Sequence, residues 1–346
     1  MSLNQRVFYA CQAVAIAPRG TATLTNNHIV HGMQSVGMSS TFSLDQVFEL
    51  GQIEIYENIE DVSDLEVTME KVIDGYKLIY DLTTSGACKT DLVAASKSRC
   101  DVHVAIFDDG VSQATGVPRN VCYNSGMYVS SVSYNYSVDG SATESVTCVG
   151  NDRFWNSTTA GVIATSPTAI WGATSDLLGT GGAPIDGDDA PKSGVVRRVD
   201  VDIEAMDSAG GLPAEVKSQG GNDPVGIGGN FHIQSISVST DFGQEQIQEL
   251  GRFGPYHRYA SFPVEVSCDF EVIATKGDLI NVSGDAPNLS NQAIIVMDTA
   301  GTVIDLGNKN KLSSVSYSGG DTGGGNANIT YSYSNFNTMT VNGGSL

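Results

Sequence analysis

The sequence predicts a mainly β fold with two tandem duplicated β-sandwich or barrel modules, each carrying a short helix or loop insertion. Three observations support this fold class: a long internal repeat, runs of alternating apolar and polar residues, and a hairpin pattern that ends both halves of the chain. Successive side chains of a strand point to opposite faces of a sheet. Alternation with a period of two therefore indicates strands with one buried and one wet face.

The internal repeat relates residues 34–51, QSVGMSSTFSLDQVFELG, to residues 234–251, QSISVSTDFGQEQIQELG, at an offset of 200 residues. Eight of these 18 positions are identical, whereas unrelated segments share roughly one. We therefore interpret the block as part of a duplicated module.

Two later matches extend the repeat. The alternating run at 65–70 corresponds to 264–269 at an offset of 199 residues, and the sequence SSVSY at 130–134 recurs at 313–317 at an offset of 183 residues. The second copy has therefore lost about as many residues in its middle as a loop and a short helix contain.

Two copies of domain length fit a chain of 346 residues, and each is long enough to form its own core. We place the first module at residues 1–150 and the second at residues 192–346. Residues 151–191 contain GTGGAP and DGDDAP, so we predict a connector or surface loop between the modules.

In the first module, the apolar segment 13–17 is predicted to be a strand. A helix is expected over residues 91–99, capped by Thr90 and with Asp91 near the positive end of the helix dipole. The apolar run 102–107 is predicted to be a strand that ends at the following Asp-Asp-Gly.

Both modules are predicted to end in a β-hairpin. In the first, the alternating run 132–138 reaches an Asp-Gly pair, and both turn positions can adopt positive φ. Its partner strand would be 144–148. In the second, 314–317 and 329–334 flank a glycine-rich turn, so the same hairpin closes both copies.

The chain is strongly acidic, with 39 acidic and 18 basic residues and a net charge of -21. Between Asp45 and Glu70 there are nine carboxylates and no Lys or Arg, whereas the equivalent part of the second module contains Arg252, His257 and Arg258. This charge disfavours binding of DNA or RNA through phosphate neutralisation, although an acidic surface can let DNA pass by repelling it. We expect the acidic segment to face a lumen or to contact Arg252 and Arg258 of a neighbouring chain.

No catalytic, cofactor or metal signature is evident, and we predict a protein that is not an enzyme and binds no cofactor or metal. His28 and His31 are three residues apart, but their flanking residues favour a loop or strand entry, and a third ligand is lacking in the sequence pattern. His103, within an apolar strand, is expected to be packed. The six cysteines contain no CxxC pair and are expected to be mostly reduced. The apolar runs fall short of membrane-spanning length.

Residues 34–82 contain an ELGQ loop, a YENIED stretch and an EVT strand that leads into VIDGY. With these elements, the segment resembles tail tube and related structural proteins of tailed bacteriophages. The second module shares the resemblance through the internal repeat. The resemblance implies modules whose sheets join those of neighbouring subunits, with long loops that clasp adjacent rings.

The resemblance also implies six modules per ring, which three copies of a two-module chain would supply. The protein would be a structural virion protein that polymerises into stacked rings, and the resulting tail tube would be the conduit for DNA ejection. Its partners would be other copies of itself and the sheath, baseplate and neck proteins, with transient passage of DNA and no membrane. It would reside in the tail of the virion after assembly in the cytoplasm of the bacterial host.

The repeated block supplies the candidate interface between subunits. The residues that we assign to it are Phe42, Gln46, Glu49, Leu50, Phe242, Gln246, Glu249, Leu250, Arg252 and Arg258. For any single residue, anchoring of a loop to the core is an equally good interpretation. Two other functions stay open: another virion β protein of the neck, baseplate or capsid surface, and a carbohydrate-binding or hydrolytic β-sandwich.

Overall fold

The computed structural model describes residues 6–21, 24, 28–84, 92–107, 118–155, 194–220, 231–282, 289–320, 322 and 325–343. Most of the predicted connector 151–191 lies outside these residues, and so do Thr90 and Asp91, the expected start of the helix. The first residues of the connector, Asp152–Trp155, form strand β9, which pairs with β7.

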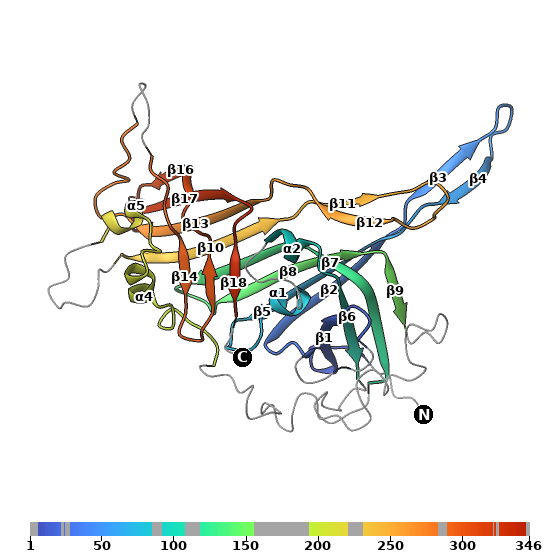
Figure 1. The fold of residues 1–346 in the computed structure, drawn as a ribbon, viewed down its shortest axis with the longest axis horizontal. Coiled ribbons are helices and arrows are strands. Elements are labelled where there is room, and N and C mark those ends of the chain that lie inside the picture. The colour runs from blue at the N-terminus through green and yellow to red at the C-terminus, as the bar shows by residue number, and fades with distance from the viewer. Residues whose placement is uncertain are drawn as a thin grey trace.

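One antiparallel sheet runs through the molecule in the order β16-β17-β13-β10-β7-β8-β5-β2 (Figure 1). Its strands are β2 (Met33–Thr41), β5 (Asp64–Val72), β7 (Asn120–Ser137), β8 (Thr143–Gly150), β10 (Ile233–Asp241), β13 (Glu265–Ile273), β16 (Lys311–Ser318) and β17 (Asn328–Phe336). The predicted mainly β fold class is confirmed, and the two terminal hairpins are confirmed as β7–β8 and β16–β17.

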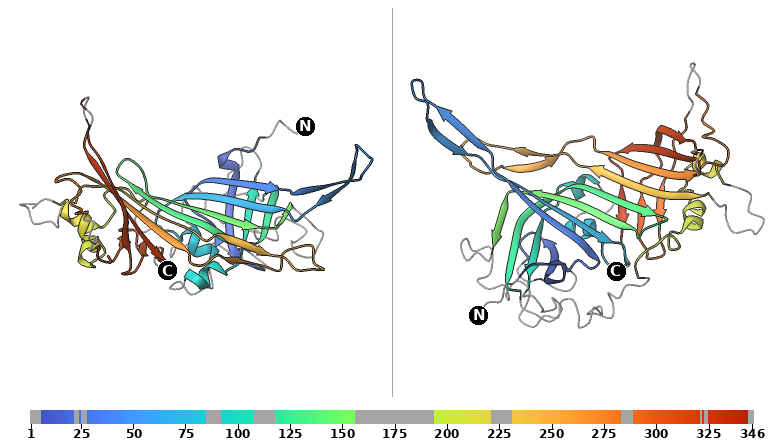
Figure 2. Two further views of the ribbon diagram at one scale, coloured as in Figure 1. Left: turned by 90° about the horizontal axis from the view of Figure 1, so that it is seen from above. Right: turned by 180° about the vertical axis from the view of Figure 1, so that it is seen from behind.

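The repeated block forms the first strand and the tip of a long hairpin in each half of the chain. In the first half, β2 and β5 continue into an arm made of β3 (Leu44–Phe48) and β4 (Ile55–Glu60). In the second half, β10 and β13 continue into an arm made of β11 (Gln244–Ile247) and β12 (His257–Ala260). Both arms extend beyond the main sheet, and the β3–β4 arm projects away from the body (Figures 1 and 2).

Smaller elements complete the fold. Near the first half of β7 lie β1 (Gln12–Pro18), β6 (Cys100–Ile106) and β9, and a separate sheet contains β14 (Ile295–Met297), β15 (Val303–Asp305) and β18 (Thr340–Asn342). The short helices are η1 (Tyr9–Cys11), α1 (Ile79–Thr83), α2 (Leu92–Ser96), α4 (Ile203–Ser208) and α5 (Ala214–Ser218). The strands predicted at 13–17 and 102–107 are confirmed as β1 and β6, and the helix predicted at 91–99 is observed as the shorter α2.

The two halves of the main sheet have the same strand order and the same irregularities. The order β16-β17-β13-β10 matches β7-β8-β5-β2 strand for strand. The β2–β5 ladder shifts register between Met33 and Ser35, and the β10–β13 ladder shifts between Ile233 and Ser235. A bulge adds one residue to one strand and re-aims the side chains beyond it, so equal bulges give both hairpins equal faces.

The pairing corrects one part of the sequence alignment. Val36 lies opposite Met69, and Ile236 lies opposite Phe270. Strand β5 is therefore related to β13 at an offset of 201 residues, and not at the predicted 199. A shift of two residues keeps every side chain on its own face, which is why the alternating pattern alone could not detect it.

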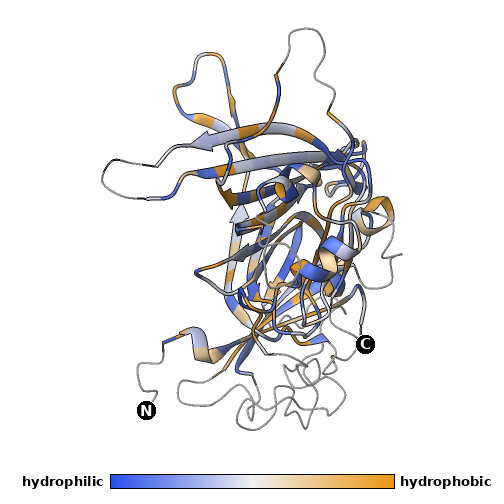
Figure 3. Ribbon diagram, turned by 90° about the vertical axis from the view of Figure 1, so that its left-hand side faces the viewer, coloured by the Kyte–Doolittle hydropathy of each residue, from blue (hydrophilic) through white to orange (hydrophobic). Residues whose placement is uncertain are grey.

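One large hydrophobic core extends through both modules, and a smaller one lies on β1, β6 and the start of β7. Buried residues on β5, β7, β13 and β17 belong to one continuous cluster that also includes residues of α1, α4 and β18. The predicted alternation holds, because Val266, Cys268 and Phe270 are buried while their neighbours on β13 are partly exposed. The mixture of hydrophilic and hydrophobic residues along the strands is visible in Figure 3.

The core of the first module contains a buried carboxylate that holds α1. Glu144 accepts hydrogen bonds from the backbone nitrogens of Ile79 at 2.6 Å and Tyr80 at 3.0 Å, and from the hydroxyl of Tyr134 at 3.1 Å. Burial raises the pKa of Glu144, while the positive charge of Lys71 and these hydrogen bonds oppose the increase. Glu144 thus satisfies the free N–H groups at the start of α1.

His103 is packed as predicted, and both of its ring nitrogens lack a hydrogen-bond partner among the described residues. Its ring lies 4.8 Å from the ring of Tyr123. Burial lowers the pKa of His103 to about 4, although the negative charge of Asp101 partly opposes this effect. The imidazole is therefore neutral in the folded protein at neutral pH.

The depressed pKa of His103 predicts a loss of stability in acid. Its contribution is fully present above pH 6.5, the unfolded value, and is lost as the pH falls toward about 4. Replacement of His103 by Leu should remove roughly 3 kcal/mol of this pH-dependent loss of unfolding free energy. Urea unfolding between about pH 4 and pH 7 measures it. The exposed His232 provides the control variant His232→Asn, which should retain the acid sensitivity of the wild type, and equal pH profiles for His103→Leu and wild type would contradict the assignment.

Candidate assembly interface

The two modules are joined edge to edge by the pairing of β10 with β7. The ladder runs from Ser235 opposite Ser137 to Asp241 opposite Ser131. It is extended at one end by the bond from the Phe242 nitrogen to the Ser130 oxygen at 2.8 Å, and at the other by the bond from the Val138 nitrogen to the Gln234 oxygen at 3.0 Å. We call this ladder and its flanking contacts the internal junction.

The strands equivalent to those of the internal junction lie at the two ends of the sheet. Strand β2 is equivalent to β10, and β16 is equivalent to β7. Among the described strands, however, β2 pairs only with β5 and β16 pairs only with β17. Each end therefore presents a row of backbone donors and acceptors without a sheet partner in this part of the chain. Such edges are templates for pairing with another chain.

Equivalent side chains differ in exposure according to whether their strand is paired on both sides. Phe242 at the internal junction is 0% exposed, whereas the identical Phe42 at the open edge is 70% exposed. Likewise, Tyr134 on β7 is buried, whereas Tyr317 on β16 is 53% exposed. The open edges thus carry the same large side chains that the internal junction covers.

The β11–β12 arm is fixed to the first module by a charged contact. The Arg258 Nη2 atom donates to the Asp64 Oδ1 atom at 2.7 Å, its Nε atom donates to the Asn151 side chain at 3.2 Å, and Gln246 also donates to Asp64. The Arg258 side chain is only 6% exposed, whereas that of Asp64 is 59% exposed. Arg258 therefore connects the second module's arm to the first module within one chain.

A second polar contact lies beside the first. The Tyr128 hydroxyl lies 2.7 Å from the Nδ1 atom of His257, and the Arg99 Nη2 atom lies 3.3 Å from the same nitrogen. Since a guanidinium can only donate, Nδ1 is the acceptor of a neutral imidazole. Burial, followed by the positive charges of Arg99 and Lys97, lowers the pKa of His257 and favours this neutral form.

Three residues of the predicted interface therefore have internal roles, because Gln246 donates to Asp64 of its own chain as Arg258 does. Phe242 is buried in the body of the protein, and Arg258 meets Asp64 of its own chain, so the expected contact of Arg258 with a neighbour's acidic segment is corrected to an internal one. Arg252 lies at the exposed arm tip, where its Nη1 atom is 3.9 Å from the Glu249 carboxylate.

Apart from Phe42 at the open edge, the remaining interface residues lie on the arms. Leu50 and Leu250 are fully exposed at the two tips, and Gln46 and Glu49 are exposed on the projecting β3–β4 arm. The structure does not bring the two leucines against any other described part of the chain. Their role in contacts between subunits stays a prediction.

The main sheet carries a continuous polar face that was not predicted from the sequence. The strand pairing brings small hydroxyl side chains from all eight strands to one face of the sheet, and all are at least partly exposed. We define this hydroxyl face by Ser35, Ser39, Thr68, Ser131, Ser133, Ser137, Thr143, Ser145, Thr147, Ser235, Ser237, Ser239, Ser267, Ser314, Ser316, Ser318, Thr330, Ser332 and Ser334. The alternation of Ser or Thr with apolar residues in most of these strands was the available signal.

The charges on the hydroxyl face are mostly negative. The face also carries the carboxylates of Glu66, Glu70, Asp241, Asp269 and Glu271. Among the residues that these eight strands place on this side, Lys311 at the start of edge strand β16 is the one basic side chain. A surface of hydroxyls and carboxylates lacks the cations that phosphate binding requires.

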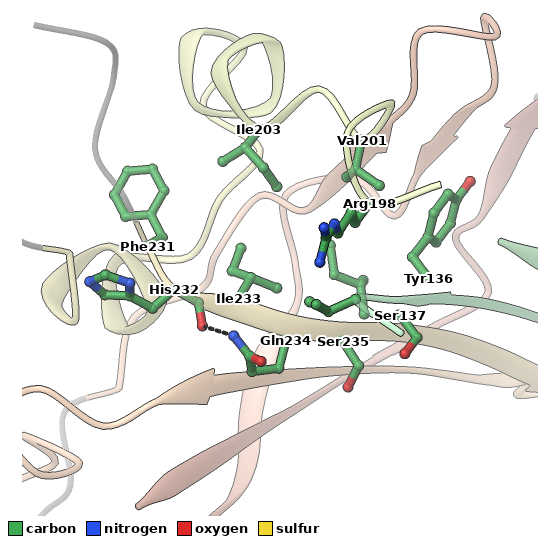
Figure 4. A pocket seen from close by; sticks show the side chains of 12 residues that line it. Tyr136, Ser137, Arg198, Val201, Ile203, Phe231, His232, Ile233, Gln234 and Ser235 are labelled. Atoms are coloured by element: carbon green, nitrogen blue, oxygen red, sulfur yellow. Dashed lines mark hydrogen bonds between the residues drawn. The ribbon is translucent and has the colours of Figure 1, made fainter. Parts of the chain in front are cut away.

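A cavity of about 270 Å³ lies where β7 ends and β10 begins. Figure 4 shows Arg198 and Tyr136 among its lining side chains, and the Gln234 amide donates to the His232 carbonyl at 3.2 Å beside it. Its described lining residues include no carboxylate.

His31 of the predicted histidine pair makes an aromatic contact. The His31 ring stacks on the Tyr76 ring, with centroids 4.1 Å apart, and no group of three potential ligands is found among the described residues. The five described cysteines are free and buried. None of the helices in the described ranges is both long enough and apolar enough to span a membrane.

No family model and no curated protein matches the chain. Several solved structures show limited similarity. The tube terminating cap of the anti-feeding prophage is 11% identical over 45% of this chain and 93% of its own, with a TM-score of 0.33. A chain of the PVC extracellular contractile injection system, in the sheath-tube complex in the extended state, is 10% identical over 43% and 90%, with a TM-score of 0.32. TM-scores this low do not support a functional assignment, so the function has to be argued from the geometry described above.

The internal contacts predict a specific cost for loosening the β11–β12 arm. Replacing Arg258 by Met keeps most of its volume but removes its hydrogen bonds to Asp64 and Asn151, and should lower the free energy of unfolding by about 2 kcal/mol. Hydrogen exchange of the arm amides should accelerate in the same variant. The exposed Arg252→Met variant is the control and should change stability by less than about 0.5 kcal/mol. Equal effects of the two substitutions would argue against the Arg258 contact.

Proposed function

We propose that this chain is a structural virion protein of a tailed bacteriophage that assembles with copies of itself into stacked rings, which form the tail tube. One observation carries the proposal. The chain contains one junction between two equivalent modules, formed by β10 and β7, and its two open edges, β2 and β16, are equivalent to the two strands of that junction. Repeating the internal junction between chains joins β2 of one copy to β16 of the next.

An interface between two different edges is heterologous, and its repetition gives a ring if the rotation closes or a helical filament if it does not. The bacteriophage resemblance implies six modules per ring, so three chains would complete one. In this arrangement Phe42 would occupy the environment that Phe242 has within the chain, and Tyr317 would lie opposite Met38, as Tyr134 lies opposite Val238.

The hydroxyl face supports a role for the tube as a conduit for DNA. Closing the sheet into a ring would give a lumen lined by this face, because the opposite face packs on the core. Hydroxyls interspersed with carboxylates make no strong contact with phosphates, so DNA could pass without being held. The exposed arm tips would then clasp adjacent rings, and sheath, baseplate and neck proteins would be the remaining partners.

Electron microscopy of the purified chain tests the proposal. The expected result is hollow tubes of stacked rings, each ring containing three chains. Single rings without stacking would favour a neck or baseplate component built on the same junction. A protein that stays monomeric at all concentrations would contradict self-assembly.

A proline at the open edge tests the pairing itself. Within the chain, the Phe242 nitrogen bonds to the Ser130 oxygen, and every second residue of an antiparallel strand bonds to the same neighbouring strand. Tyr134 therefore uses its N–H in the internal junction. Its equivalent, Tyr317, would use its N–H in the junction between chains. Tyr317→Pro should therefore abolish assembly, since proline removes this N–H. Tyr317→Ala retains it and should assemble at a higher protein concentration. Both variants should melt cooperatively, as measured by circular dichroism, and normal tubes from Tyr317→Pro would contradict the pairing.

Lysines on the hydroxyl face test the conduit. Wild-type assemblies should not retain linear DNA at low salt, whereas the double variant Ser145→Lys with Ser237→Lys should bind it with a strong dependence on salt. The neutral variant Ser145→Gln with Ser237→Gln controls for side-chain size. Co-sedimentation measures retention, and DNA binding by wild-type assemblies would oppose a lumen formed by this face.

A further inference from the structure

The internal junction also shows which side chains would meet at the junction between two copies. Strand β4 is related to β12 at an offset of 200 residues, because Gln46 pairs with Asn58 as Gln246 pairs with Arg258. Glu57 is therefore the equivalent of His257.

The receiving side follows from the β7 and β16 ladders. Tyr128 pairs with Val149 on β8, and Lys311 pairs with Ser334 on β17. Each ladder then shifts register immediately afterwards, between Val129 and Ser131 or between Leu312 and Ser314. Lys311 is therefore the equivalent of Tyr128.

Within the chain, the arm residue His257 meets the strand residue Tyr128 at 2.7 Å. At the corresponding place between copies, the arm residue is Glu57 and the strand residue is Lys311. Both Glu57 and Lys311 are exposed in the single chain. A neutral hydrogen-bonded pair is thus replaced by two residues of opposite charge.

The neighbouring contact changes in a compatible way. Asp64 is the first residue of β5 and lies opposite Thr41, and its equivalent on β13 is Glu265. Gln46 is identical to Gln246 and can donate to Glu265 as Gln246 donates to Asp64. The equivalent of Arg258 at the junction between copies is Asn58, whose amide can donate a hydrogen bond but carries no charge. Glu57 and Lys311 are therefore the oppositely charged pair at this junction.

We propose that Glu57 on the β3–β4 arm of one copy forms an ion pair with Lys311 on β16 of the next copy, and that this pair sets the register of the junction between chains. The inference rests on the proposed self-assembly through β2 and β16. It also explains the position of Lys311: the one basic residue on the described hydroxyl face lies at the edge where the acidic arm of a neighbour would arrive. Complementary charges at such a site favour the correct register and exclude others.

Charge reversal tests the pair. Glu57→Lys and Lys311→Glu should each raise the protein concentration needed for assembly by about tenfold, since each places like charges together, and the double variant should restore most of the loss. The effect of each single reversal should decrease at high salt. Sedimentation of the assembled fraction at about 50 mM and about 500 mM salt measures both effects, because the Debye length falls roughly threefold between these concentrations.

Glu54→Lys and Lys309→Glu are the matched controls, because both residues are exposed and lie outside the proposed contact. They should assemble like the wild type. If the wild type assembles and the four single reversals behave alike, the ion pair is wrong while the proposed function stands. If the wild type does not assemble, the proposed function itself fails.

A crosslink provides an independent measurement. A mixture of Glu57→Cys and Lys311→Cys chains should form disulfide-linked dimers under mild oxidation, whereas Glu54→Cys mixed with Lys311→Cys should not. The five described native cysteines are buried and free. Assembly of the first mixture without a disulfide between positions 57 and 311 would overturn the pair, and absence of assembly would again count against the proposed function.

Discussion

The backbone ladder between β10 and β7 is the interaction on which the rest of the structure depends. It joins the four main strands of each module into one sheet and so makes the large core and the hydroxyl face continuous. It also positions the β11–β12 arm against the first module, where Arg258 meets Asp64. Because edge strands carry unpaired donors and acceptors, joining two edges inside the chain leaves two equivalent edges outside it.

The modules share a backbone framework but differ in the side chains that occupy it. Glu144 in the first module binds the start of α1, whereas the equivalent position on β17 is the buried Ile329. His257 and Arg258 on one arm correspond to Glu57 and Asn58 on the other. Strand pairing tolerates these differences because the ladder uses backbone atoms, so the side chains are free to distinguish the internal junction from one between copies.

Much of this framework could be predicted from the sequence. The alternation of apolar and polar residues identified most strands, and the Asp-Gly turn identified the β7–β8 hairpin. The repeat identified the equivalent hairpins, but it placed β5 against β13 with an error of two residues. A period of two is unchanged by such a shift, and only the pairing of Val36 with Met69 and of Ile236 with Phe270 fixed the register.

The sequence by itself determined the β class, the repeat, the acidic charge and the two terminal hairpins, because these depend on local periodicity and composition. Only the tertiary structure decided that Phe242 is buried while the identical Phe42 is exposed. The same holds for Arg258, which is an internal contact and not a surface for a neighbour. Both outcomes follow from which edge strands pair, and strand pairing between residues far apart in the chain leaves no mark in the sequence around any one of them.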